Sequence, residues 1–344
     1  MNKKNLKAAF FVGATLAFIS FTFYFYQVFY SPNVLINKEK AVLLIPEDAD
    51  IYDVLDSMQS YNYLEDAVSF MFVSKILSYQ ENIRPGRYII SQKMNNLEFV
   101  RHLRSGAQAP VKVTLTSVRH KEEIAPKLCL NLTAEVETFD SLVNDPAFVE
   151  ELGFDTITVA TMFLPNTYEM YWTTDAPSLI NRMKGEYDRF WNEERLAKAK
   201  ELEMTPTEVS ILASVVQAET KKNDEKPVVA GLYINRIKKG MPLESDPTVI
   251  FGIGDFTIRR VLRSQLKYES PYNTYLNTGL PIGPINIPEL SSIDAVLNYE
   301  RHNYIFMCAK DDFSGYHNFA TNLSQHNRNA RKWQAALNRR KIMK

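Results

Sequence analysis

The sequence is poor in the groups that most redox, metal and nucleotide sites require. Only two cysteines occur in 344 residues, Cys129 and Cys308, and no CxxC, HExxH or GxxxxGK[ST] pattern is present. These patterns are the usual signatures of zinc sites and nucleotide-binding loops, so neither a metal nor another cofactor is predicted. A disulfide between the two cysteines and two separate thiols are both compatible with their spacing.

An excess of charge of one sign is also lacking. Forty basic side chains balance forty acidic ones. Nucleic-acid-binding domains are usually basic, so nucleic acid is not a predicted partner. The basic stretch 328–344 is expected to be a solvated terminal helix.

The N-terminal region contains one long apolar run. Residues 1–7 carry three lysines, and no charged residue follows until Lys38. The apolar and aromatic stretch 8–30 is long enough to cross about 30 Å of hydrocarbon as a helix. The lysines before it predict a cytoplasmic N-terminus, and Tyr24, Tyr26 and Tyr30 are typical of the far interface.

A cleaved signal peptide is the alternative interpretation of this run. Its apolar region exceeds the usual 7–15 residues, and no small-x-small cleavage site follows. We therefore predict a cytoplasmic tail at 1–7, a single-pass anchor at 8–30, and the rest of the chain outside the cytoplasmic membrane.

The next part of the chain alternates between strand and helix patterns. Strands are expected at 41–45 and 87–90, and helices at 51–58, 67–77 and 97–103. A strand at 111–118 and a helix at 122–130 follow. These patterns predict a small α/β domain at 38–108, a second strand–helix unit at 109–160, and a third domain at 161–344. A single long amphipathic helix is predicted at 177–200.

The most informative segment runs from Thr205 to Glu219. Thr205, Pro206 and Glu208 have the order of a helix N-cap, first residue and capping box. The segment 209–216 is apolar on nearly every side, as in a buried helix, and Glu219 extends its apolar stripe. Burial and the negative helix C-terminus both disfavour an ionised carboxyl, which is the profile of a general acid. A structural ion pair with Lys221, Lys222 or an arginine is the competing interpretation.

The region after this helix is rich in turn-forming and polar residues. Six of twelve glycines and seven of sixteen prolines lie between Pro227 and Pro288. Aromatic, amide and carboxylate groups in this region suit the stacking and hydroxyl recognition that a sugar chain needs. The candidates are Asn235, Asp246, Tyr272, Asn273, Thr274 and Tyr275. An inert surface of loops is the alternative. His317, Asn322 and His326 are expected either to line a groove or to satisfy buried polar groups.

These segments resemble the endolytic murein transglycosylases, also called the MltG or YceG-like family. The resemblance is carried by 212–220 (LASVVQAET), 233–236 (YINR), 245–252 (SDPTVIFG), 271–275 (PYNTY), 279–285 (GLPIGPI) and 317–327 (HNFATNLSQHN). Upstream, Arg84-Pro85-Gly86-Arg87-Tyr88 is similar to the LysM-like region of that family. The essential glutamate of the family falls on Glu219, and Gln217 stands where relatives often carry a second glutamate.

The resemblance implies an α+β fold: a transmembrane helix, small LysM-like units, and a helix-rich catalytic domain with short strands. It also implies non-hydrolytic cleavage of the β-1,4 bond from N-acetylmuramic acid to N-acetylglucosamine, leaving 1,6-anhydro ends. Glu219 would be the catalytic acid and base. The expected substrate contacts are Asn235, Asp246, Tyr272, Asn273, Tyr275 and Asn322. Peptidoglycan strands, the inner membrane and the peptidoglycan synthases would be partners, with the catalytic domain periplasmic and no cofactor.

Two other functions are compatible with the residues. A two-carboxylate hydrolase would use Asp246 as nucleophile or base and would leave reducing ends. A non-catalytic scaffold would bind peptidoglycan through the small domain and would be fixed near the synthesis machinery by the anchor.

Overall fold

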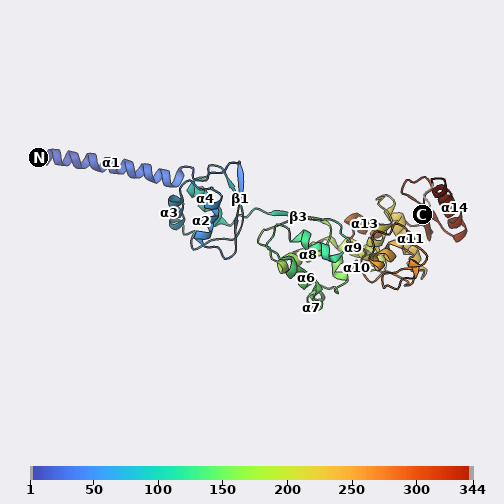
Figure 1. Ribbon diagram of the computed structural model, residues 1–344. Coiled ribbons are helices and arrows are strands. Elements are labelled where there is room, and N and C mark those ends of the chain that lie inside the picture. Colours follow the sequence, from blue (N-terminus) through green and yellow to red (C-terminus); the bar gives the residue numbers. More distant parts are fainter. Residues whose placement is uncertain (1–2, 341–344) are drawn as a thin grey trace. The chain divides into compact units, whose positions relative to one another are not determined.

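A computed structural model describes residues 3–340, with its elements labelled in Figure 1. It divides the chain into two units. The first contains Met1–Lys112 with the short segments Asn131–Thr133 and Glu169–Asp175; the second contains Val113–Leu130, Ala134–Tyr168 and Ala176–Lys344. Helices dominate, and each sheet has two strands, which confirms the predicted α+β class. Residues 1–2 of the expected cytoplasmic tail and residues 341–344 of the basic stretch lie outside the described residues.

Helix α1 (Lys3–Tyr30) fits a single-pass anchor. It is the one helix of the described residues that is long and apolar enough to cross a membrane. Its last turn belongs to the fold of the first unit, because Val28 and Phe29 are buried and α1 packs on α3 (Ala67–Ile76) and α4 (Asn96–Ser105).

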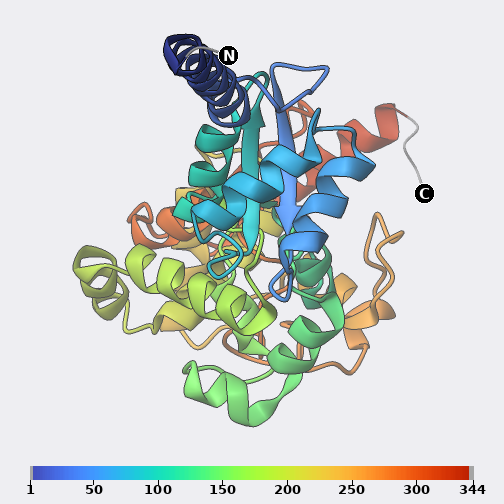
Figure 2. The same ribbon diagram turned by 90° about the vertical axis from the view of Figure 1, so that its left-hand side faces the viewer.

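The other elements of the first unit lie where the sequence predicts them. Strands β1 (Lys40–Ile45) and β2 (Gly86–Ser91) pair antiparallel, with Leu43 opposite Tyr88. Between them come α2 (Ile51–Ser60) and α3. Figure 2 shows the two strands side by side, with the helices packed against them. Alternate strand residues and the apolar helix faces form one core, which includes Tyr88, Phe70 and Phe99.

The second unit is built around α10 (Pro206–Glu219). This helix packs against α9 (Glu193–Glu201), α11 (Lys226–Lys238), α12 (Asp246–Ile253), α13 (Leu290–Leu297) and η2 (Thr158–Met162). The remaining elements of the chain are β3 (Val111–Leu115), η1 (Lys121–Glu123), α5 (Ile124–Leu128), α6 (Val136–Asn144), α7 (Pro146–Glu151), β4 (Asn166–Met170), α8 (Ala176–Phe190), η3 (Gln265–Lys267), β5 (Phe306–Ala309), β6 (His317–Ala320) and α14 (Leu323–Arg339). Of these, β3 and β4 each contain residues of both units. Strands β3 and β4 pair, as do β5 and β6. The domain boundaries that the sequence places at residues 108 and 160 stay predictions.

The prediction of one continuous helix over 177–200 is wrong. Helix α8 ends at Phe190, and Asn192 begins α9 by accepting the backbone N–H of Arg195 at 3.0 Å. The Arg195 guanidinium lies over the Phe190 ring, 4.1 Å from its centroid, and donates to the Phe190 carbonyl at 3.3 Å. An asparagine cap in mid-segment therefore divides the apolar pattern between two helices.

Candidate active site

Helix α10 begins as its sequence predicts. The Thr205 N–H donates to the Glu208 carboxylate at 2.7 Å, and the Glu208 N–H donates to the Thr205 hydroxyl at 3.2 Å. All eight residues of the apolar run 209–216 are buried. Glu219 is the last helical residue, so the buried helix carries this carboxyl group to its C-terminal end.

Two hydroxyl groups hold the Glu219 carboxylate. Tyr233 of α11 donates to its Oε1 at 2.7 Å, and Ser245, which precedes α12, donates to the same oxygen at 2.5 Å. Burial raises the pKa of Glu219, whereas these two hydrogen bonds and nearby His317 lower it, and Asp246 raises it again. The net pKa lies above the ordinary value of glutamate because desolvation is the largest effect.

Glu219 opens onto a cavity of about 460 Å³. Asp246 and Tyr275 line the same cavity, and the Tyr275 hydroxyl donates to Asp246 Oδ1 at 2.7 Å. Burial and the Asp246 charge both raise the pKa of Tyr275, which therefore stays a neutral hydrogen-bond donor. A carboxyl with a raised pKa, a second carboxylate and polar hydroxyls thus face one space.

His317 is fixed at this cavity by a buried acid. Glu225, 4% exposed, accepts the backbone N–H of His317 at 2.6 Å and holds its ring Nδ1 at 2.9 Å. Because Nδ1 is occupied, Nε2 is the ring nitrogen left for other partners. His317 is therefore positioned by Glu225 and lines the cavity together with Glu219.

Three of the expected substrate contacts, all asparagines, use their side-chain amides to bind backbone groups of the protein. Asn235 donates to the carbonyls of His302 and Tyr304 at 2.7 and 3.0 Å. Asn273 is fully buried and ties its own loop through the carbonyls of Leu266 and Tyr268. Asn322 is the N-cap of α14, whose Gln325 N–H it accepts at 2.9 Å.

Tyr272 lies apart from the Glu219 cavity. It lines a smaller cavity of about 220 Å³ with His120, and its ring contacts Phe251 at a centroid distance of 4.7 Å. The structure thus brings together Glu219, Asp246 and Tyr275 from the expected set. Substrate contact by any of the six expected residues stays a prediction.

Sequence reasoning missed the residues that hold Glu219 and His317. Tyr233 and Glu225 belong to α11 and its N-cap, and Ser245 is the N-cap residue of α12, so no periodicity of α10 connects them with Glu219. Their one signal was membership in the family-like segments: Tyr233 begins YINR and Ser245 begins SDPTVIFG. Glu225 lies in none of these segments.

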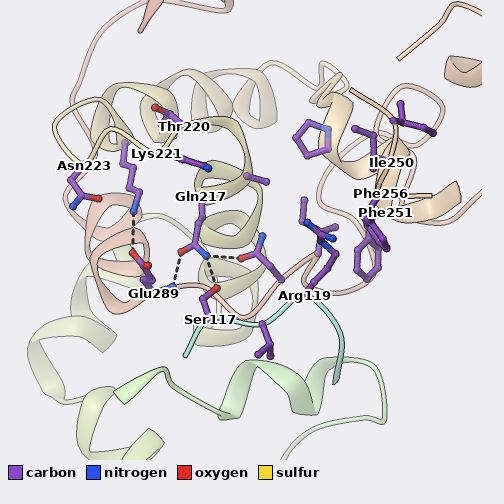
Figure 3. A pocket seen from close by; sticks show the side chains of 17 residues that line it. Ser117, Arg119, Gln217, Thr220, Lys221, Asn223, Ile250, Phe251, Phe256 and Glu289 are labelled. Atoms are coloured by element: carbon purple, nitrogen blue, oxygen red, sulfur yellow. Dashed lines mark hydrogen bonds and ion pairs between the residues drawn. The ribbon is translucent and has the colours of Figure 1, made fainter. Parts of the chain in front are cut away.

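A second cavity of about 760 Å³ adjoins the end of α10 (Figure 3). Gln217 lies in its wall and uses its whole amide group. Its Nε2 donates to Ser117 Oγ and Asn286 Oδ1, while its Oε1 accepts the Glu289 N–H and the Ser292 hydroxyl. The amide therefore joins α10 to α13, to the segment before α13 and to the chain after β3.

The chain is similar to known proteins over most of its length. The model of the YceG-like family matches residues 43–332. Over 324 residues, the chain is 25% identical to a Streptococcus pneumoniae serotype 2 protein named endolytic murein transglycosylase, covering 85% of this chain and 58% of that protein. A Bacillus subtilis protein of the same name is 24% identical over 317 residues, covering 88% of this chain and 87% of the relative.

A solved structure has a similar fold. The crystal structure of a yceG-like protein from Listeria monocytogenes aligns with a TM-score of 0.56 at 25% identity, covering 85% of this chain and 99% of that chain. The chain spans less than two thirds of the length of the Streptococcus pneumoniae relatives that it matches.

Proposed function

Since this chain belongs to the YceG-like family, we propose that it cleaves peptidoglycan glycan strands as an endolytic transglycosylase, with Glu219 as acid and base. The observation that carries the proposal is the setting of Glu219. Its carboxyl has a raised pKa, is oriented by Tyr233 and Ser245, and faces a cavity. The matching relatives named endolytic murein transglycosylase support the same substrate class.

One carboxyl group suffices for this reaction. Protonated Glu219 gives its proton to the glycosidic oxygen as the bond from that oxygen to C1 of the muramic residue breaks. The 6-hydroxyl of the same muramic residue then forms a bond to C1 and returns its proton to Glu219, which leaves a 1,6-anhydro end. No water or other reactant is consumed. The 2-acetamido group of the substrate would stabilise the cationic centre.

A two-carboxylate hydrolase is the second candidate because Asp246 lines the cavity of Glu219. In that reaction a water molecule would supply the new bond at C1, and the products would carry reducing ends. The hydrogen bond from Tyr275 occupies one oxygen of Asp246 and favours a binding role for this carboxylate in the transglycosylase reaction.

The location and partners form part of the same proposal. Helix α1 would anchor the chain in the inner membrane with its N-terminus cytoplasmic and the second unit periplasmic, close to the peptidoglycan synthases. The first unit would be LysM-like and would bind or space the glycan. Its order of strand, helix, helix and strand around a two-stranded antiparallel sheet supports this assignment.

The test is digestion of purified peptidoglycan with the full chain and with Glu219→Gln, followed by mass spectrometry of the products. We expect 1,6-anhydro ends from the natural chain and a loss of about 10²–10⁴-fold in rate for the variant. Glu201→Gln, which changes an exposed carboxylate on α9, is the matched control. Reducing ends would instead identify a hydrolase, and binding without any cleavage would identify a scaffold.

A further inference from the structure

The 760 Å³ cavity of Figure 3 is lined by chain neighbours of residues that line the proposed catalytic cavity. Ala218 and Thr220 line the larger cavity, while Glu219 between them lines the smaller one. In the same way Pro247 faces the larger cavity and Asp246 the smaller. The two cavities therefore lie on different sides of the same end of α10 and of the same start of α12.

The walls of this larger cavity carry an excess of positive charge. Arg119, Lys221 and Lys226 line it, against one carboxylate, that of Glu289. Arg119 and Lys221 make no ion pair within residues 3–340. The Arg119 guanidinium is instead held over the Phe256 ring at 4.0 Å.

Lys226 is the unusual member of this group. Its side chain is 3% exposed, yet its ammonium group lies 3.6 Å from Glu289 Oε2 and 3.3 Å from the Ser291 hydroxyl. A charge-assisted hydrogen bond normally measures about 2.7–2.9 Å. A buried cation is costly unless it is closely paired, so this position is suited to receive an anion.

The positive charge of this cavity indicates which part of the proposed substrate it would bind. The sugars of a peptidoglycan strand are uncharged, and its carboxylates lie on the stem peptides attached to the muramic residues. We infer that the cavity lined by Arg119, Lys221 and Lys226 binds the carboxylates of a stem peptide while the sugar it branches from lies at Glu219. The inference rests on the proposed function. Phe251 and Phe256 would offer apolar walls to the alanine side chains of the peptide.

The test compares glycan strands that carry stem peptides with the same strands stripped by an amidase, which lose the peptide carboxylates and keep one lactyl carboxylate on each muramic residue. The full chain, Lys226→Met and Arg119→Gln are measured on both, with Lys200→Met on the exposed face of α9 as control. We expect the ratio of kcat/KM for stem-bearing over stripped strands to fall about tenfold in the two cavity variants. Arg119 is exposed, so its variant is informative even where Lys226→Met fails to fold.

An unchanged ratio, or an equal loss on both substrates, would overturn the inference. If the natural chain cleaves neither substrate, the proposed function fails, and the inference is decided by binding alone. Calorimetric titration of the full chain with a soluble stem pentapeptide would then have to give binding that both cavity variants weaken about tenfold. Absence of binding, or binding that neither variant weakens, would sink it.

Discussion

Opposing effects act on the carboxyl group of Glu219. Its position at the end of a buried helix raises its pKa, and the hydroxyls of Tyr233 and Ser245 reduce that rise because they donate to the ionised form. A group that first donates and then recovers a proton works best when its pKa lies near the working pH. The two hydroxyls are therefore expected to tune the acid as well as orient it.

Replacing Tyr233 by phenylalanine removes one of the donors that favour ionised Glu219. The pKa of Glu219 should rise further, so the acid stays protonated to a higher pH. We expect the alkaline limb of the kcat/KM profile to move to higher pH, with a smaller loss of rate than in Glu219→Gln. Tyr268→Phe, which changes a tyrosine that is 46% exposed, is the control. A limb that stays in place or moves to lower pH contradicts this role for Tyr233.

Sequence reasoning singled out Glu219 as the proposed acid, but it did not find the groups around this residue. The apolar-stripe spacing of Glu219 was equally compatible with a structural ion pair, and the neighbouring and family-like segments favoured the acid. Asn235 and Asn273 have side chains suited to sugars, yet both amides tie loops through backbone carbonyls. An amide that fixes a loop and an amide that faces a ligand have the same local sequence, and only the fold distinguishes them.

At the scale of elements, a helix boundary was predicted correctly where its signal lies within a few neighbouring residues. The capping box at Thr205 predicted the start of α10 correctly, because both of its hydrogen bonds lie within four residues. In the segment 177–200 the helical spacing of apolar residues continues from α8 into α9. Periodicity alone therefore predicted one helix where the structure has two. Gln217 shows what short-range sequence patterns miss. All four hydrogen-bond partners of its amide lie 69 to 100 residues away in the sequence.

The capping box also gives a measurable contribution to stability. Thr205→Ala removes the side chain that accepts the Glu208 N–H and leaves that donor to solvent. We expect the free energy of unfolding of the second unit to fall by about 0.5–2 kcal/mol, measured by chemical denaturation. Thr116→Ala, at an exposed position after β3, is the matched control and should change it by less than about 0.5 kcal/mol. Equal effects of the two substitutions would show that the cap does not stabilise α10.

At the scale of the whole molecule, the end of the anchor and the start of the first unit share residues. Val28 and Phe29 are 5% and 7% exposed, and the Val28 carbonyl accepts the buried Asn96 amide at 2.8 Å. The sequence predicted the apolar run 8–30 from composition, but composition does not tell which of its residues face lipid and which pack on protein. Asn33 completes this junction by donating to Asn96 Oδ1 at 2.7 Å.

This junction predicts that two shortened chains will behave differently. A chain beginning at Gln27 loses the exposed part of α1 and should leave the membrane fraction, while its first unit stays folded. A chain beginning at Ser31 also loses Val28 and Phe29, and it leaves the Asn96 amide without the Val28 carbonyl. Burial of two apolar side chains and one hydrogen bond contributes about 3–7 kcal/mol, so the first unit should unfold at a clearly lower denaturant concentration.

Two measurements test this prediction. Chemical denaturation in detergent-free buffer compares the stability of the first unit in the two shortened chains, and sedimentation with membranes measures anchoring. If both chains unfold at the same denaturant concentration, Val28 and Phe29 do not stabilise the first unit. If the chain beginning at Gln27 still sediments with membranes, α1 is not the membrane anchor.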